Sequence, residues 1–175
     1  MITIASVKDE LHRQFPADPV PLYPPMMGMD PLGVDGYASF ANVRWNEVPA
    51  ASHGGWYDIC PPNGFSSFDP PHMWNYHLPG FLSFSLADDE RSVDALDSFT
   101  YFFNRCDPKR ALSHAPSGPW WKSATFSGGY SCEQCQVVVN FLHLLKCSEG
   151  NPPLYHEWDD LNAETLDKWI YRSKC

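Results

Sequence analysis

Prolines and glycines are concentrated in one part of this 175-residue sequence. Residues 16–72 contain eleven of the 17 prolines and six of the 11 glycines. Proline removes a backbone donor and clashes with the preceding turn, so a continuous helix is not expected there. We therefore predict a long irregular segment over 16–72. Two short extended pieces, at 37–45 and 55–60, suit at most one short β-hairpin.

On both sides of this segment, apolar residues recur at helical spacing. Apolar side chains recur at i, i+3 and i+4 in five stretches, each preceded by a candidate N-cap or helix start. The first expected helix covers 7–15 with Ser6 as its N-cap, and the second follows Asp69 and runs from Pro71 to about Leu86. Three more are expected to start at Ser92, Ser131 and Asn162. In the last of these, Leu166, Trp169 and Ile170 are expected to face the core. Pro79 is expected to kink or split the second helix.

The stretch SCEQCQVVVNFLHLLKC, residues 131–147, is the best-defined helix. Ser131 followed by Gln134 fits a capping box. The apolar positions form a broad arc, which predicts a central helix: Cys135, Val137, Val138, Val139, Phe141, Leu142, Leu144 and Leu145. The polar positions lie opposite: Glu133, Gln136, Asn140 and His143. Cys135 is expected to act as a small apolar core residue.

Two chemical interpretations of the same stretch compete with the core helix. A structural zinc site needs four ligands, and Cys132 with Cys135 has no second pair at zinc-finger spacing, so no metal site is predicted. A redox dithiol remains an alternative because Cys132 lies at a helix start, where thiol pKa values fall. The six cysteines are predicted to be thiols, because no secretory signal precedes them.

The aromatic stretch DPPHMWNYHLPGFLSF, residues 69–84, also has two interpretations. Its aromatic rings suit a stacking platform for a sugar or a base. Trp74, Leu78, Phe81 and Leu82 share one helical face, however, which favours a core helix. The fold prediction is therefore mainly α: a helical bundle of about five helices in a single domain, 1–175. Residues 73–175 form the helical core, and 16–72 pack on it.

Charge limits the classes of function. The chain has 12 basic and 21 acidic residues, a net charge of −9, which opposes binding to nucleic-acid phosphates and suits a basic partner. No apolar run is long enough to span a membrane. We expect a cytoplasmic protein with no cofactor.

Catalytic signatures are missing: the sequence has no G-x-S-x-G, P-loop, G-x-G-x-x-G or H-E-x-x-H motif. No catalytic residue is therefore predicted, and an enzyme is the less favoured class. The alternatives to a binding protein are a small hydrolase or thiol-dependent enzyme using Cys132 with a histidine, and a structural domain that forms homo-oligomers.

Two aromatic-rich motifs and an acidic tail carry a resemblance. HMWNYHLPGFLSFSL, then SCEQCQVVVNFLHLL, then YHEWDDLNAETLDKW resemble a family of small uncharacterised bacterial proteins, over about residues 56–170. The matched positions are Tyr76, Leu78, Pro79, Ser131, Gln134, Phe141 and Leu142. The resemblance implies structural motifs and brings no catalytic residues. The general character, small and acidic, is also similar to immunity proteins and antitoxins, which block a bacterial toxin or effector.

The acidic tail is the predicted partner-binding surface. It combines aromatic anchors with a negative field in one short segment, namely Tyr155, Glu157, Trp158, Asp159 and Asp160. The irregular segment, with Trp45 and Trp56, is the rival surface.

Overall fold

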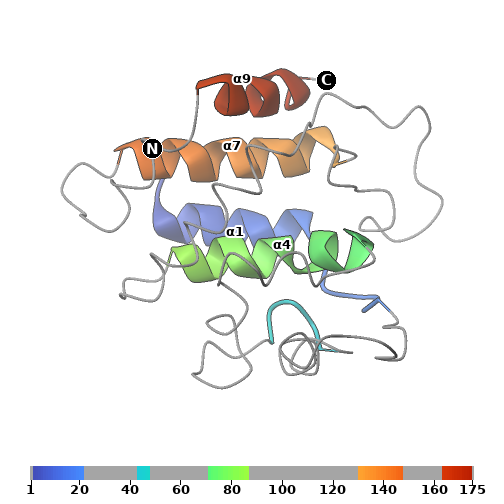
Figure 1. The fold of residues 1–175 in the computed structure, drawn as a ribbon. Helices are drawn as coiled ribbons and strands as arrows, with labels where there is room; N and C mark the ends of the chain where they lie inside the picture. Colours follow the sequence, from blue (N-terminus) through green and yellow to red (C-terminus); the bar gives the residue numbers. More distant parts are fainter. Residues whose placement is uncertain (1, 22–42, 48–70, 87–129, 148–162, 175) are drawn as a thin grey trace, which may run out of the picture.

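The structure, a computed structural model, describes residues 2–21, 43–47, 71–86, 130–147 and 163–174 (Figure 1). Within these ranges the chain forms four α-helices and no strand. The mainly α class is confirmed for this part of the chain. The predicted helix from Ser92 lies outside the described residues. So do the two extended pieces except for 43–45, where the chain enters a turn instead of a strand.

Helix α1, Ile4–Gln14, begins three residues earlier than predicted. Its N-cap is Thr3, whose hydroxyl accepts a hydrogen bond from the Ser6 amide at 3.1 Å, while the Ser6 hydroxyl accepts one from the Thr3 amide at 2.9 Å. The prediction that Ser6 is the N-cap is therefore wrong. The predicted inner face is confirmed, since Val7, Leu11 and Phe15 are all fully buried.

Helix α4, Pro71–Ser85, runs through Pro79 as one helix. Of the two predicted outcomes, a split is therefore wrong, and a kink stays a prediction. Proline removes one intrahelical hydrogen bond, at a cost of about 3 kcal/mol. Burial of Leu78, Phe81 and Leu82, all fully buried, contributes about 1.5–3 kcal/mol each. The packing gain therefore outweighs the proline penalty. It also confirms the core-helix interpretation for these positions.

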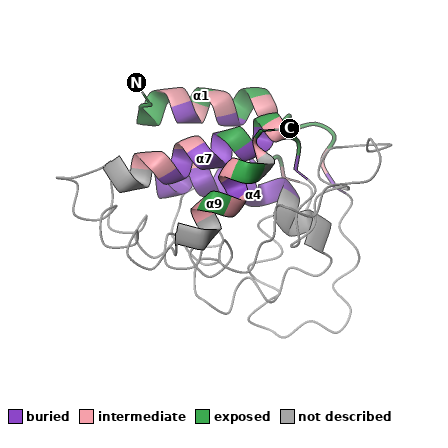
Figure 2. Cartoon of the chain, turned by 90° about the horizontal axis from the view of Figure 1, so that it is seen from above, coloured by how far each residue is buried: buried purple, intermediate pink, exposed green. Residues whose placement is uncertain are grey.

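Helix α7, Cys132–Cys147, has the predicted capping box. The Gln134 amide donates to the Ser131 hydroxyl at 3.2 Å, and the Ser131 amide donates to the Gln134 side-chain oxygen at 3.0 Å. The predicted apolar arc is buried from Cys135 to Leu142, whereas Leu144 is partly exposed. On the polar side Glu133 and Gln136 are exposed, and Asn140 and His143 are partly exposed (Figure 2).

Helix α9, Ala163–Arg172, completes the described bundle. It packs on α7, α7 packs on α1, and α1 packs on α4, so the four helices form a stack in the order α9, α7, α1, α4 (Figure 1). Trp169, predicted to face inward, is fully buried, whereas Leu166 and Ile170 are partly exposed.

Neighbouring helices in the stack are antiparallel. The start of α7 meets the end of α1 through Gln134 and Gln14, and further along α7 Asn140 meets Glu10. Trp169, late in α9, contacts Tyr130, just before α7. The starts of α1 and α9 and the ends of α4 and α7 therefore lie at one end of the bundle, which we call the Thr3 end (Figure 1).

Candidate functional site

The opposite end of the bundle is built from aromatic side chains, and we call it the aromatic end. Its five large rings are each at most 2% exposed: Phe15, Trp45, Tyr76, Tyr130 and Trp169. The Tyr130 ring lies 6.4 Å from the Phe15 ring and 5.8 Å from the Trp169 ring, measured between centroids. This end is therefore closed by packing and offers no exposed aromatic platform among these five rings.

Trp45 holds the turn at 43–47 against this end. Its indole nitrogen donates to the Phe15 carbonyl oxygen at 3.0 Å, and its backbone amide donates to the Tyr76 hydroxyl at 3.3 Å. At 2% exposure, Trp45 is unavailable to a partner. The prediction that Trp45 belongs to a rival binding surface is therefore wrong. Trp56 lies outside the described residues.

Tyr76 connects three parts of the chain through one hydroxyl. It accepts from the Trp45 amide and donates to the carbonyl oxygen of Ala17. Burial raises the pKa of Tyr76 to about 12, because the phenolate would lose its hydration. The hydroxyl therefore stays protonated at neutral pH and acts as a structural donor.

Replacing Tyr76 by phenylalanine is expected to lower the free energy of unfolding by about 1–3 kcal/mol at pH 9, because the buried Trp45 amide and the partly buried Ala17 carbonyl lose their hydrogen bonds. The native state holds the Tyr76 proton more tightly than the unfolded chain, whose tyrosines titrate near 10. Stability of the parent therefore falls between pH 10 and 12, and the variant lacks this loss. Urea unfolding at pH 9 and pH 11 should show the difference in unfolding free energy between the parent and the variant shrink by about 1 kcal/mol.

Tyr171→Phe, at an exposed tyrosine, is the control. If the difference between the parent and Tyr76→Phe stays constant with pH, the raised pKa of Tyr76 is contradicted.

Charged groups near this end pair at the surface. The Arg44 guanidinium donates to Asp18 at 3.0 Å and to Glu47 at 3.1 Å. The hydrogen bond to Asp18 is the main reason that the pKa of Arg44 is raised above its usual value. All three groups are exposed, so these ion pairs position the turn but add little stability.

The predicted partner-binding residues Tyr155, Glu157, Trp158, Asp159 and Asp160 lie outside the described residues. The structure does describe the two points where their segment joins the bundle. Residues 148–162 connect Cys147, the last residue of α7, to Ala163, the first residue of α9. Because α7 and α9 are packed and antiparallel, both points lie at the Thr3 end (Figure 1).

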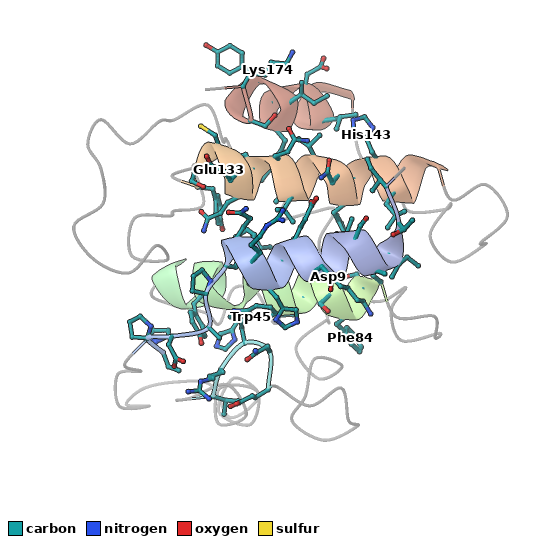
Figure 3. The ribbon with its side chains drawn as sticks, turned by 180° about the vertical axis from the view of Figure 1, so that it is seen from behind. Asp9, Trp45, Phe84, Glu133, His143 and Lys174 are labelled. Carbon is teal, nitrogen blue, oxygen red and sulfur yellow. The ribbon has the colours of Figure 1, made fainter. Side chains whose placement is uncertain are left out.

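Charge is unevenly divided along the sequence. The described ranges contain seven of the 21 acidic residues and seven of the 12 basic residues. The net charge of −9 is therefore contributed entirely by the remaining sequence. The described acids lie on separate elements: Asp9, for example, belongs to α1 and Glu133 to the first turn of α7 (Figure 3). At the start of α7, hydrogen bonds from the Glu133 amide and from Ser131 lower the pKa of the Glu133 carboxyl.

Among the described side chains, one cysteine differs from the prediction. Cys132 is disulfide-bonded, so the prediction that all six cysteines are thiols is wrong. The bond is not made with Cys135, and the partner lies outside the described side chains. An even cysteine count was the available sequence signal, but the inferred compartment argued against it.

Cys135 is a core residue, as predicted. It is fully buried, and its sulfur lies 3.9 Å from the Tyr130 carbonyl oxygen. A sulfur held in a disulfide is not a thiolate, which argues against a thiol enzyme with Cys132 as its nucleophile. The described residues contain no group of three or more side chains suited to hold a metal ion. None of the described helices combines the length and apolar character needed to cross a bilayer.

No protein-family model, curated protein or solved structure matches this chain. The family resemblance therefore stays a prediction. The positions that carry it have structural roles: Tyr76, Leu78, Pro79, Phe141 and Leu142 are buried, and Ser131 and Gln134 form the capping box. Sequence reasoning missed that Gln134 also donates to the Gln14 carbonyl oxygen at 3.1 Å.

Proposed function

We propose that this protein is a binding protein that blocks a basic protein partner, in the manner of an immunity protein or antitoxin acting on a bacterial toxin or effector. The observation that carries the proposal is the division of charge. The described helices are neutral in sum, and the whole net charge of −9 belongs to the sequence between them. A neutral scaffold with acidic connections suits recognition of a cationic surface, since complementary charge accelerates encounter.

The placement of the two attachment points supports 148–162 as the recognition segment. Both ends of this segment are fixed to helices that pack against each other. A partner that bound this segment would therefore meet the protein at the Thr3 end, where the two helices join the segment.

The residues of this segment have different proposed roles. Glu157, Asp159 and Asp160 supply the negative field that steers a basic partner towards the segment. Tyr155 and Trp158 supply apolar area, and aromatic anchors of this kind usually dominate the lifetime of a complex. The acidic residues are therefore expected to set the association rate, and the two aromatic rings the dissociation rate.

Reversing the two adjacent aspartates, Asp159→Lys with Asp160→Lys, is expected to slow association by about tenfold at low salt and to weaken its salt dependence. Trp158→Ala is expected mainly to speed dissociation. The measurement is surface plasmon resonance at two salt concentrations. The immobilised protein is the basic product of a gene adjacent to the one encoding this chain.

Asp18→Lys with Glu47→Lys makes the same change of charge at two exposed positions near the aromatic end and is the matched control. Its effect on association should be smaller, because screening limits charge effects to about 8–10 Å at physiological salt. Equal association rates for the parent and the 159/160 variant, both with native circular dichroism spectra, would contradict the acidic site. If no adjacent gene encodes a basic protein that binds this chain, the proposed class of immunity protein or antitoxin is contradicted. Sedimentation of the protein alone tests the homo-oligomer alternative.

A further inference from the structure

Helix α9 lies at the edge of the described stack (Figure 1), and its outer face carries an exposed aromatic ring between charges of opposite sign. Asp167, Tyr171 and Lys174 are all exposed. Their spacing of i, i+4 and i+7 places them on the side of the helix opposite the buried Trp169. The helical turn continues past the end of α9, since the Ser173 amide donates to the Trp169 carbonyl oxygen at 3.0 Å. We call these three exposed side chains the α9 stripe, and Figure 3 shows Lys174 on the side of α9 away from α7.

The order of the residues makes the α9 stripe complementary to itself. Two helices that pair in antiparallel fashion about a two-fold axis between positions 170 and 171 bring residue n of one copy opposite residue 341 − n of the other. Asp167 of each copy then faces Lys174 of the other copy. Tyr171 faces Ile170, which is partly exposed. One two-fold contact therefore pairs both charges twice and covers both rings.

The two charges do not meet within a single copy. Seven residues separate Asp167 from Lys174, about 10 Å along the helix axis. Among the described residues neither side chain forms an ion pair. Between them Tyr171 is 66% exposed, more than Ile2 or Ile4, the other exposed large apolar side chains that are described. Tyrosine is enriched at protein interfaces, where its ring is buried and its hydroxyl stays near water.

We propose that α9 is a self-association surface, on which two copies of this chain pair in antiparallel fashion through their α9 stripes. Helix α9 has ten residues, so the contact is smaller than a standard interface of about 1,600 Å². The dimer is therefore weak, with a dissociation constant of about 0.1 mM. At the lower concentrations used for unfolding measurements the protein is monomeric. The dimer requires no other protein, so it stands or falls separately from the proposed basic partner.

Sedimentation equilibrium of the full-length protein from about 10 μM to about 1 mM tests the dimer. The buffer contains about 0.15 M salt, which screens repulsion between two acidic chains beyond about 8 Å. We expect the weight-average mass to rise with concentration towards that of two chains. Tyr171→Ala should raise the dissociation constant by about tenfold or more, because the dimer loses both rings.

Reversing one charge at a time gives a sharper test. Asp167→Lys leaves only basic charges on the α9 stripe, and Lys174→Asp leaves only acidic ones, so each variant alone should stay monomeric. An equimolar mixture of the two variants should associate at least as well as the parent, because both cross-pairs are again of opposite charge. Asp9→Lys makes the same change at an exposed position of α1 and is the matched control. It should dimerise like the parent.

The proposal is overturned if the parent stays monomeric up to about 1 mM. It is also overturned if a parent dimer persists unchanged in both single charge variants, which would place the contact elsewhere on the chain. A mixture of the two variants that does not associate contradicts the antiparallel pairing. Native circular dichroism spectra of all variants show that each result reports association and not unfolding.

Discussion

Trp169→Ala is expected to lower the free energy of unfolding by about 3–5 kcal/mol, the usual cost of truncating a large buried aromatic side chain. Trp169 is fully buried, and its ring lies 5.8 Å from that of Tyr130. The ring contact itself contributes about 0.5–1.5 kcal/mol beyond the buried area. The measurement is urea unfolding followed by circular dichroism.

The same helix offers a close control. Tyr171 lies two residues further along α9 and is 66% exposed, so Tyr171→Ala is expected to change stability by less than about 0.5 kcal/mol. Trp169→Phe should fall between the two, because the smaller ring retains part of the packing, and it remains informative if Trp169→Ala does not fold. A Trp169→Ala protein as stable as the parent would show that α9 is not docked through this ring.

The buried faces of the helices were predictable from the sequence, because the residues on a buried face are apolar and recur at helical spacing. Val7, Leu11 and Phe15 recur every fourth residue, and all three are fully buried. The arc of α7 was predictable for the same reason, with polar Gln136 exposed among buried valines. The spacing of apolar residues indicates which side of a helix faces the core, even when the helix that packs against it is not known.

Helix boundaries were less predictable because several residues can satisfy the same local rule. Thr3 and Ser6 both carry hydroxyls three residues apart, and either is an acceptable N-cap. The structure uses both, with Thr3 as the cap and Ser6 as its reciprocal partner. Pro79 does not divide α4, for a different reason: the burial of its neighbours is a tertiary effect, which the local sequence does not report.

The contacts that join distant parts of the chain were not predictable. The Tyr76 hydroxyl meets Ala17, 59 residues away, and the Gln134 side chain meets Gln14, 120 residues away. No local pattern specifies such pairs. The Cys132 disulfide belongs to the same class, since cysteine spacing alone does not give connectivity.

The candidate site was predictable only in its chemistry. The sequence marks 155–160 as acidic and aromatic, while the structure contributes the two fixed ends of the segment, at Cys147 and Ala163. Trp45 illustrates the limit of composition: a tryptophan in an irregular, Pro-rich segment suggested an exposed anchor, yet it is a buried part of the core.

Leu142→Ala tests whether α7 is the centre of the bundle. Leu142 is 1% exposed, in the helix that packs on both α1 and α9. Removing its side chain is expected to lower the free energy of unfolding by about 2–5 kcal/mol, because the surrounding helices close only part of the cavity. The measurement is again urea unfolding.

Leu144→Ala is the matched control for this substitution. It makes the same change two residues along α7, at a partly exposed position. Leucine and alanine have nearly equal helix propensities, so the difference between the two variants reports packing and not helix formation. The Leu142 variant should lose clearly more stability than the Leu144 variant. Equal losses would mean that the two faces of α7 are packed alike, and a stable Leu142→Ala protein would remove α7 from the centre of the fold.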